Sequence, residues 1–419
     1  MRTFSVPYGK SKQTLVVSGT ETVDVYDPVD QPSEVTDSGA VASALAQPMG
    51  ALRLDDFRAA RSVAIAINDK TRPVPHHLLL PPLLEELESL GLGPRVRLYI
   101  ATGTHAPMTP DEYPAILPAY ILERYPVVSH NCDDGENLAH LGVTSRGVPV
   151  WVNREFYASD LKIVVGNIEP HHFAGFSGGY KTAAIGMAGR VTINGNHIML
   201  ADPRSRMGIF EQNPLRQDIE EIGRLMQVHF ALNVRLNARK EILAAYFGDP
   251  GLVLQAGIPD TRRLTETQLP DAYDLVITSP GGYPKDINFY QSQKAFSSAA
   301  MVTRDGGTII LVAACAEGSG SPSFEAFMED VDSYEAVLEK FHRQGFQVGP
   351  HKALQVALVG QRVRLMIVSD MAEALSRRFL LTPSDDLQSA YAEARSLLPE
   401  NARVAILPHA TNILPVVTA

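Results

Sequence analysis

The chain has 419 residues, and its 37 Lys and Arg residues against 47 Asp and Glu residues give a formal net charge of −10. The length is sufficient for two domains, and a hydrophobic content of 45% is typical of a packed globular protein and excludes a disordered chain. The negative charge argues against a nucleic-acid-binding protein, because such proteins gain affinity by neutralising phosphates.

The two cysteines, Cys132 and Cys315, lie far apart and outside any CxxC pattern, which excludes a disulfide framework and a cysteine-rich zinc site. The N-terminal residues contain no apolar signal segment, and no apolar run approaches the roughly 20 residues that a membrane-spanning helix needs. We therefore expect a cytoplasmic protein that binds neither nucleic acid nor a membrane.

Short runs rich in β-branched residues alternate along the chain with longer helical patterns. Expected strands are at residues 63–67, 96–100, 161–165, 230–234, 275–278, 308–312, 365–368 and 404–407. Expected helices include residues 81–90, 215–226, 286–300 and 333–344. Because the strands are apolar on both faces, the alternation predicts an α/β fold with mainly parallel sheets.

A polar stretch between residues 248 and 271, flanked by Gly and Pro, predicts a boundary between two lobes. We expect an N-terminal cofactor-binding α/β domain at residues 1–265 and a C-terminal α/β domain at residues 266–402. The C-terminal domain would close an active-site cleft between the lobes. The last strand, within residues 403–419, could join either lobe.

Polar residues follow four of the expected strands, at residues 68–73, 101–105, 166–172 and 279–284. Ligands of parallel α/β sheets bind beyond the carboxyl ends of the strands. We therefore expect these four strand ends to converge on one cleft.

The segment at residues 169–197 is the densest in groups that could carry chemistry. Gly175, Gly178 and Gly179 would let the backbone approach a phosphate at the start of a helix, although the same pattern fits a tight connection. Lys181 and Thr182 resemble the end of a P-loop, but the GxxxxGK[ST] spacing is absent, which argues against binding of a nucleoside triphosphate.

Histidines gather near the same strand ends: His105, His171 and His172, with His197 16 residues after Lys181. A lone histidine is usually structural, whereas several at one sheet edge can exchange protons near neutral pH or bind nickel or zinc. Two histidines on opposite faces of a substrate would suit removal and return of a proton. A zinc site of three histidines also stays open, although no HExxH motif occurs.

Arg72 follows a strand and offers a planar guanidinium that matches a carboxylate, unless it is an ordinary surface residue. Tyr290, Gln291 and Lys294 occur at helical spacing and form either a solvated face or a positive wall of an anion pocket. His351 and Lys352 are a further pair of the same kind.

Five ordered motifs resemble the nickel-dependent lactate racemase family. They are DKTRPVP at residues 69–75, ATGTH at 101–105, EPHHFAGFSGGYK at 169–181, NH at 196–197 and GGYPKDINFYQSQK at 281–294. The resemblance spans nearly the whole chain and implies two α/β lobes that hold a nickel-pincer nucleotide. This cofactor is a pyridinium-3-thioamide-5-thiocarboxylic acid mononucleotide that binds nickel and is covalently attached to a lysine.

The resemblance also implies roles for individual residues around the cofactor. Lys181 would be the covalent attachment point and His197 the nickel ligand. Ser177, Gly178 and Gly179 would lie at the cofactor phosphate. The soft sulfur donors would then belong to the cofactor, which accounts for the absence of a cysteine cluster.

The implied activity is racemisation or epimerisation of a 2-hydroxy acid by reversible hydride transfer. His105 and His171 would be the two catalytic acid/bases, one per enantiomer, with Asp69 beside the cofactor orienting His105. Arg72 would hold the substrate carboxylate. The remaining substrate-binding residues would be Tyr290, Gln291, Lys294 and His351, although the match around His351 is loose.

Two positions depart from the lactate-acting pattern: Tyr180 stands where those members have Arg, and His172 where they have Phe. The substrate is therefore lactate, malate or another 2-hydroxy acid. Expected partners are this small molecule and the enzymes that build the cofactor, and the sequence is compatible with a homo-oligomer. The alternatives are a zinc-dependent hydrolase that uses His105, His171 and His197, and a non-catalytic protein that binds an anion or carries the cofactor.

Overall fold

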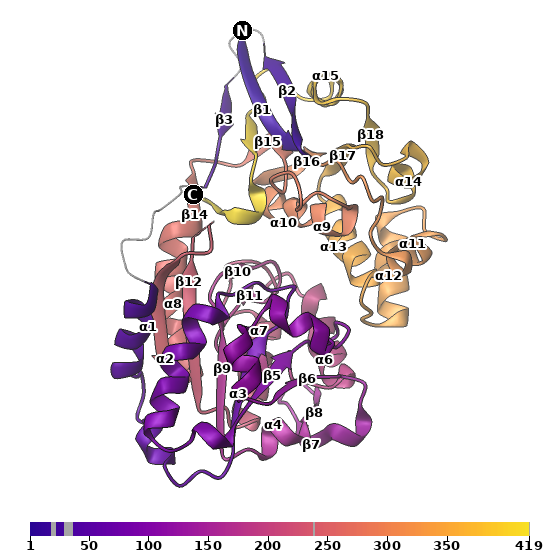
Figure 1. The fold of residues 1–419 in the computed structure, drawn as a ribbon. Coiled ribbons are helices and arrows are strands. Elements are labelled where there is room, and N and C mark those ends of the chain that lie inside the picture. The colour runs from indigo at the N-terminus through magenta and orange to yellow at the C-terminus, as the bar shows by residue number, and fades with distance from the viewer. Residues whose placement is uncertain (18–21, 29–36, 238, 419) are drawn as a thin grey trace. The chain divides into compact units, whose positions relative to one another are not determined.

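The computed structural model describes residues 1–17, 22–28, 37–237 and 239–418 of the chain. It divides into two compact units, one formed by Met1–Val29 and Leu264–Ala419 and the other by Asp30–Arg263. We call them the terminal unit and the central unit. Figure 1 labels the helices and strands of both units.

The central unit is built on a six-stranded sheet with the strand order β13-β12-β9-β4-β5-β6. Neighbouring strands are parallel, except that β12 and β13 are antiparallel. The strands are β4 (Val63–Asn68), β5 (Val96–Ala101), β6 (Val127–Ser129), β9 (Leu161–Asn167), β12 (Phe230–Leu236) and β13 (Ile242–Gly248). Every residue of β9 is buried, as expected for a strand covered on both faces.

Helices and two hairpins complete the central unit. The α-helices are α1 (Asp37–Ala46), α2 (His76–Ser89), α3 (Ala119–Arg124), α4 (Arg154–Ala158), α5 (Lys181–Ala184), α6 (Arg190–His197), α7 (Pro214–Leu225) and α8 (Pro250–Thr265). The 3-10 helices are η1 (Leu54–Phe57), η2 (Gly93–Arg95), η3 (Pro110–Ala115), η4 (Gly135–Asn137) and η5 (Ile198–Ala201). The antiparallel hairpins are β7 (Leu138–Val143) with β8 (Pro149–Asn153), and β10 (Pro170–His171) with β11 (Gly175–Phe176).

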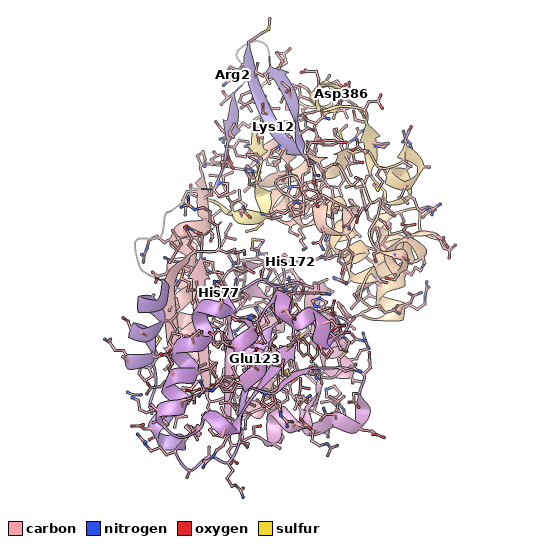
Figure 2. The ribbon with its side chains drawn as sticks, viewed as in Figure 1. Arg2, Lys12, His77, Glu123, His172 and Asp386 are labelled. Atoms are coloured by element: carbon pink, nitrogen blue, oxygen red, sulfur yellow. The ribbon has the colours of Figure 1, made fainter. Side chains whose placement is uncertain are left out.

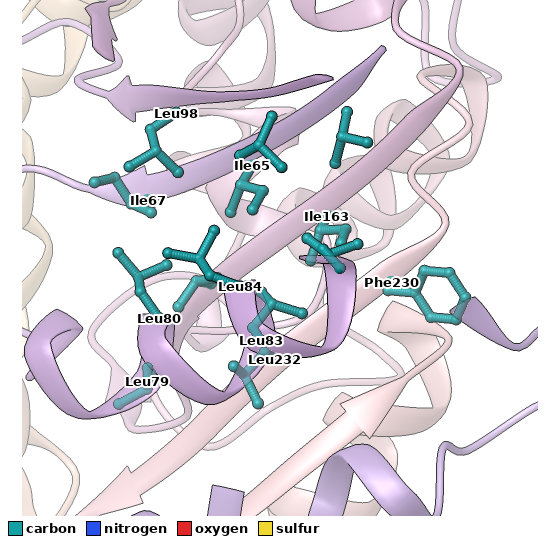
Figure 3. Close-up of a cluster of buried hydrophobic side chains, with 14 of the residues drawn as sticks. Ile65, Ile67, Leu79, Leu80, Leu83, Leu84, Leu98, Ile163, Phe230 and Leu232 are labelled. Atoms are coloured by element: carbon teal, nitrogen blue, oxygen red, sulfur yellow. The ribbon is translucent and has the colours of Figure 1, made fainter. Parts of the chain in front are cut away.

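Helix α2 packs its leucines onto the central sheet (Figure 3). Leu79, Leu80 and Leu83 are fully buried and recur at the spacing that places side chains on one helix face. They belong to one cluster with strand residues such as Ile65 and Leu98. Burial of one such leucine contributes about 1.5–3 kcal/mol, so this layer holds the strands whose ends carry the candidate site.

The terminal unit contains a second six-stranded sheet, which is parallel throughout and has the order β18-β17-β16-β15-β19-β3. Its strands are β3 (Val23–Val25), β15 (Tyr273–Thr278), β16 (Thr303–Val312), β17 (Arg364–Val368), β18 (Thr382–Ser384) and β19 (Val404–Leu407). Two-stranded pairs are formed by β1 (Arg2–Tyr8) with β2 (Ser11–Val17) and by β14 (Glu266–Leu269) with β20 (Leu414–Val417). The helices are α9 (Phe289–Ser292), α10 (Lys294–Ala300), α11 (Pro322–Met328), α12 (Tyr334–Gln344), α13 (Pro350–Gly360), α14 (Glu373–Arg378), α15 (Leu387–Ser396) and η6 (Ala410–Asn412).

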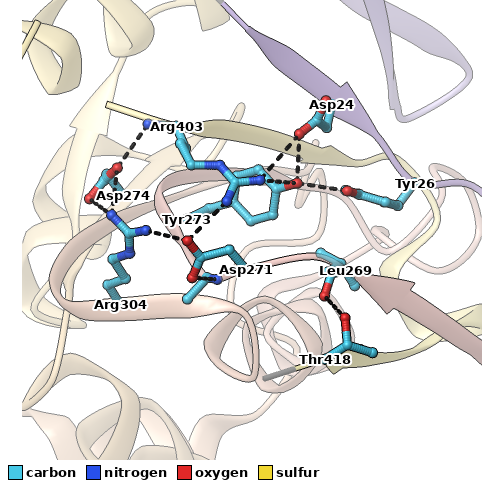
Figure 4. Close-up of polar contacts among 10 residues, drawn as sticks. Asp24, Tyr26, Leu269, Asp271, Tyr273, Asp274, Arg304, Arg403 and Thr418 are labelled. Carbon is cyan, nitrogen blue, oxygen red and sulfur yellow. Dashed lines mark hydrogen bonds and ion pairs between the residues drawn. The ribbon is translucent and has the colours of Figure 1, made fainter. Parts of the chain in front are cut away.

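Polar contacts fasten the N-terminal strand β3 to the start of β15 (Figure 4). The Tyr273 hydroxyl donates to Asp24 Oδ2 at 2.6 Å. The Arg403 guanidinium lies 4.8 Å from the centroid of the Tyr273 ring and pairs with Asp271 at 3.0 Å. Strand β3 is thereby held by the start of β15, and Arg403, close to the C-terminus, also lies 3.9 Å from Asp24.

The expected α/β class with mainly parallel sheets is confirmed, and all eight expected strands are present. The expected helix at residues 286–300 is interrupted. Asp286 is buried and accepts a hydrogen bond from the Gly9 backbone N–H, and α9 begins only after Asn288, whose side chain accepts from the Gln291 backbone N–H. These two polar contacts replace the first helical turn.

The division into units differs from the expected one in its membership. The chain passes from the central to the terminal unit at residues 263 and 264, next to the expected boundary at 265. Residues 1–29, however, group with the C-terminal part, because β3 pairs with β19, and Val6 and Leu15 of the β1–β2 hairpin join the terminal core. The last strands also belong to the terminal unit, since β19 pairs with β15 and β20 with β14.

Within the described ranges, no helix has the length and apolar character needed to cross a membrane.

Candidate active site

A pocket opens at the carboxyl ends of β4, β5 and β9, which are neighbours in the central sheet. Its lining includes Asp69, Arg72, His105, His171, Lys181 and His197, all of which the sequence singled out. The fourth strand end, at residues 279–284, follows β15 in the sheet of the terminal unit. Three of the four expected strand ends therefore meet at one pocket, and the contribution of the fourth to the same cleft stays a prediction.

His105 and Asp69 form a close pair on one wall of the pocket. His105 Nδ1 lies 2.6 Å from Asp69 Oδ2, and Asp69 Oδ1 accepts from the backbone N–H and the hydroxyl of Thr71 at 3.0 and 2.7 Å. Burial alone would raise the pKa of Asp69, but hydrogen bonds from His105 and Thr71 outweigh it and hold that pKa below its usual value. The ionised carboxylate can only accept, so Nδ1 donates to it, and a neutral His105 has its lone pair on Nε2.

His171 is held differently from His105. It is buried, and its Nδ1 accepts a hydrogen bond from the Ala174 backbone N–H at 3.2 Å. Burial, followed by the positive charges of Lys181, His172 and Arg72, lowers the pKa of His171 well below its ordinary value. The ring is therefore neutral at physiological pH and carries its proton on Nε2.

His172 lies next to this histidine and is labelled in Figure 2. Its ring stacks on that of His171, with the centroids 4.6 Å apart and the planes at 14°. Both rings also meet Phe173 edge to face, at centroid distances of 4.5 and 4.7 Å. His172 is therefore in direct contact with His171, one of the two predicted catalytic histidines.

Lys181 begins the short helix α5, and its side chain lines the pocket. Burial, together with the positive charges of Arg72 and Arg216, lowers its pKa to about 7. A substantial fraction of this side chain is therefore the uncharged, nucleophilic amine near neutral pH.

His197 is the last residue of α6. Burial, followed by the charges of Lys181 and Arg72, lowers its pKa to about 3. An imidazole binds a metal ion only in its neutral form, and His197 has that form across the physiological range.

The glycine turn before Lys181 is packed by protein groups. Gly178 and Gly179 have φ of 84° and 57°, a region that other residues rarely adopt. The Gly179 N–H donates to Asn233 Oδ1 at 2.7 Å, and Arg216 donates to the carbonyl oxygens of Phe176 and Gly178 at 2.9 and 3.0 Å. The Gly179 N–H already has a partner within the protein. Gly179 is therefore explained by a tight connection and not by a contact with a phosphate.

Ser177 and Gly178 remain on the lining of the pocket. The Ser177 hydroxyl donates to the Asn167 carbonyl oxygen at 2.8 Å, which fixes the start of the turn. Sequence reasoning missed Arg216 and Asn233, the two side chains that hold this turn. Neither stands at a strand end, and a fully buried arginine on a helix gives no sequence signal.

The other predicted substrate-binding residues form a cluster in the terminal unit. The rings of Tyr290 and His351 meet edge to face at 6.1 Å, and the Lys352 ammonium lies 5.4 Å from the Tyr290 ring centroid. The Lys294 ammonium donates to Gln291 Oε1. The four predicted residues are therefore neighbours, gathered around the ends of α9, α10 and α13.

The zinc alternative requires three protein ligands close together. Across residues 1–17, 22–28, 37–237 and 239–418, no three or more His, Cys, Asp or Glu side chains are arranged so that they could hold a metal ion. His105, His171 and His197 share the pocket but do not form such a group, so the geometric basis for a zinc hydrolase is lacking in this part of the chain.

Comparisons with known proteins point to one family. The family model for the lactate racemase N-terminal domain matches residues 8–208, and that for the lactate racemase C-terminal domain matches residues 270–415. The chain is 30% identical over 424 residues to lactate racemase of Thermoanaerobacterium thermosaccharolyticum, covering 99% of both chains. It is 32% identical over 311 residues to lactate racemase of Lactiplantibacillus plantarum, covering 74% of this chain and 73% of that protein.

Solved structures show the same relationship. The lactate racemase apoprotein from T. thermosaccharolyticum superimposes with a TM-score of 0.91 at 28% identity, over all of both chains. A protein from Thermotoga maritima superimposes with a TM-score of 0.64 at 18% identity, over 94% of this chain and all of that one, and shares the fold.

Proposed function

This chain belongs to the lactate racemase family and is an isomerase, and from that premise we propose that it racemises or epimerises a 2-hydroxy acid with a nickel-pincer nucleotide attached to Lys181. The observation that carries the proposal is that Lys181, His197, His105 and His171 line one pocket. Because the named relatives are lactate racemases, lactate is the first candidate substrate, with malate and other 2-hydroxy acids beside it.

The groups of the pocket fit such a cofactor. His197 is a neutral imidazole, as a nickel ligand must be, and Lys181 has a pKa of about 7, which leaves much of its amine free to form a covalent bond. The described lining residues include no cysteine, so the sulfur donors that nickel favours would come from the cofactor. When bound, the cofactor supplies a reversible hydride acceptor, which avoids removing a proton from a carbon beside an ionised carboxylate.

His105 takes the role of the proton acceptor. Its Nε2 lone pair receives the hydroxyl proton of the substrate, and the imidazolium that forms is stabilised by the Asp69 carboxylate at Nδ1. The same Nε2 returns the proton when the hydroxyl is restored. Such a positioned acid/base contributes about 10²- to 10⁴-fold in rate.

His171 takes a different part in its resting tautomer. With Nδ1 occupied by the Ala174 N–H, its Nε2–H donates a hydrogen bond to the substrate oxygen and stabilises negative charge there. It becomes a second proton acceptor, serving the other enantiomer, only if the ring gives up the bond to Ala174. The two histidines are thus inequivalent in their resting states.

Arg72 provides the positive charge for the substrate carboxylate. Arg72 lines the same pocket as Lys181, His197 and His171, and its positive charge adds to the effect of burial in lowering the pKa of all three. A bidentate guanidinium–carboxylate contact would fix the orientation of the α-carbon. Gln291, Lys294, Tyr290 and His351 stay predicted substrate contacts, to be tested by the effect of their replacement on KM.

The covalent attachment can be tested directly. Protein produced together with the cofactor-building enzymes should contain one nickel per chain and a mass increase on the peptide that contains Lys181, and a Lys181→Arg control should lack the mass increase. Nickel bound without a modified Lys181 would overturn the attachment site.

The reaction can be tested by a screen of lactate, malate and other 2-hydroxy acids in deuterated water, with loaded protein. Interconversion of enantiomers with the α-hydrogen retained is the expected result. Exchange of the α-hydrogen with solvent would instead indicate ordinary acid/base racemisation. Binding of hydroxy acids without interconversion would favour the non-catalytic anion or cofactor carrier.

A further inference from the structure

A buried polar pair lies behind His197. Asn196 precedes it on α6, and Asp218 projects from α7. Both side chains are 0% exposed, and burying a carboxyl and an amide is costly unless their hydrogen bonds are satisfied. Asn196 belongs to the NH motif at residues 196–197, which predicts no function for it, and Asp218 belongs to none of the five motifs.

The orientation of the Asn196 amide is fixed by its partners. Nδ2 donates to the backbone carbonyl oxygen of Leu215 at 3.0 Å and to Asp218 Oδ2 at 2.9 Å. A backbone carbonyl can only accept, so the atom facing Leu215 is the NH₂ group and the other is the oxygen.

The Asn196 amide oxygen determines which ring nitrogen of His197 carries the proton. Asn196 Oδ1 lies 3.0 Å from His197 Nδ1. An amide oxygen has no proton to give, so Nδ1 must be the donor, and a neutral ring then has its lone pair on Nε2. Asp218 accepts from the same amide, and this polarisation strengthens the acceptor character of Oδ1.

We propose that Asn196 and Asp218 are positioning residues that hold His197 in the Nδ1–H tautomer and present Nε2 to a divalent metal ion. Metal-binding histidines commonly donate their second N–H to an oxygen acceptor, and loss of that acceptor typically weakens metal binding about 10- to 100-fold. The inference rests on the proposed function for the identity of the metal site, and the tautomer itself is measured without any metal.

The tautomer test uses apoprotein labelled with ¹⁵N in its 12 histidines. Long-range ¹H–¹⁵N correlation spectra distinguish a protonated Nδ1 from a protonated Nε2, and a His197→Gln variant identifies the His197 signals. We expect protonated Nδ1 in the unaltered chain and a loss of that preference in Asn196→Leu. A protonated Nε2 in the unaltered chain, or an unchanged His197 signal in Asn196→Leu, would overturn the proposal.

The metal test follows the release of nickel from cofactor-loaded protein to EDTA. Asn196→Leu should release nickel about 10- to 100-fold faster than the unaltered chain, and Asp218→Leu, which removes the acceptor of the Asn196 NH₂ group, should also release it faster. Both variants should keep the covalent modification of Lys181. Asp218→Leu leaves Asn196 in place, so it also answers the question if Asn196→Leu does not fold.

Thr144→Val is the matched control. Thr144 is buried and opposes the rise that burial causes in the pKa of Asp218, and its hydroxyl accepts from the Val148 backbone N–H at 3.2 Å. Its replacement therefore disturbs the same buried region without removing the contact between Asn196 and His197. Nickel release and the tautomer should be unchanged in this variant. If Thr144→Val released nickel as fast as Asn196→Leu, the effect would be one of general packing and the proposal would be overturned. If the unaltered chain contained no nickel and no modified Lys181, only the proposed function would be refuted.

Discussion

Replacement of Asp69 by asparagine is expected to abolish most of the activity by reversing the tautomer of His105. Asp69 Oδ1 accepts two hydrogen bonds from Thr71, at 3.0 and 2.7 Å, so the oxygen of an asparagine would occupy this position. Its NH₂ group would then replace Oδ2, 2.6 Å from His105 Nδ1 in the unaltered chain. The histidine could no longer donate from Nδ1, and its neutral form would carry the proton on Nε2, where the substrate needs an acceptor.

The size of the loss follows from this geometry. In other enzymes, an amide that replaces the carboxylate behind a catalytic histidine lowers kcat about 10⁴-fold, which corresponds to about 5.4 kcal/mol of transition-state stabilisation. Asp69→Asn should therefore lose about 10³- to 10⁴-fold in kcat, with KM changed far less. Nickel content and the mass of the Lys181 peptide should stay the same, because the hydrogen bonds of Asp69 are made with His105 and Thr71.

The assay is the initial rate of racemisation from each enantiomer, measured on protein with equal nickel loading. Thr71→Val is the control, because it removes the hydroxyl but leaves both the Thr71 backbone N–H and the contact between Asp69 and His105, and it should lose less than tenfold. An Asp69→Asn variant within tenfold of the unaltered chain would refute the assignment of His105 as the oriented proton acceptor.

Three further predictions concern other groups. His171→Gln retains an N–H donor and should keep more activity than His171→Ala and than His105→Gln, as measured by kcat at equal nickel content; equal losses in the two glutamine variants would contradict the inequivalence of the two histidines. In apoprotein, Lys181 keeps its proton up to pH 10.5 when unfolded but loses it near pH 7 when folded, so the unfolded state binds more protons in this window. Urea denaturation should therefore show the stability of the unaltered chain rising relative to Lys181→Met from about pH 7 to 10.5, and a constant difference would contradict the lowered pKa. Leu83→Ala, in the fully buried face of α2, should lower the free energy of unfolding by about 2–5 kcal/mol, and a loss under 1 kcal/mol would show that the site relaxes around the missing side chain.

The strands and the pocket could be predicted because they depend on local patterns. A buried parallel strand is a short apolar run, and its carboxyl end is the next residue along, so Asp69, His105 and His171 were placed at a sheet edge from sequence alone. The long-range pairing could not be predicted in this way. The contact of β3 with β19 joins residues 23–25 to residues 404–406, and nothing near either segment signals the other.

Helix α2 shows a local pattern that tertiary packing overrides. Proline favours the first turn of a helix, so the sequence favoured a start at Pro81. The structure starts α2 at His76, with Pro81 and Pro82 inside it. Burial of the preceding residues Leu79 and Leu80 against the sheet outweighs the hydrogen bonds that the prolines cannot make.

The two departures from the lactate-acting pattern have different physical meanings. Tyr180 is buried against Gly223 of α7. Any side chain at position 223 would clash with the Tyr180 ring, because a Cβ there would lie 2.3 Å from it. The tyrosine at position 180 therefore requires the glycine at position 223. An arginine at position 180 would have to find other space, so we expect a replacement there to act on packing beside the pocket. His172 stacks directly on His171, so its polarity and charge act on a ring that contacts the substrate in the proposed mechanism. The choice among hydroxy acids should consequently depend on position 172 far more than on position 180.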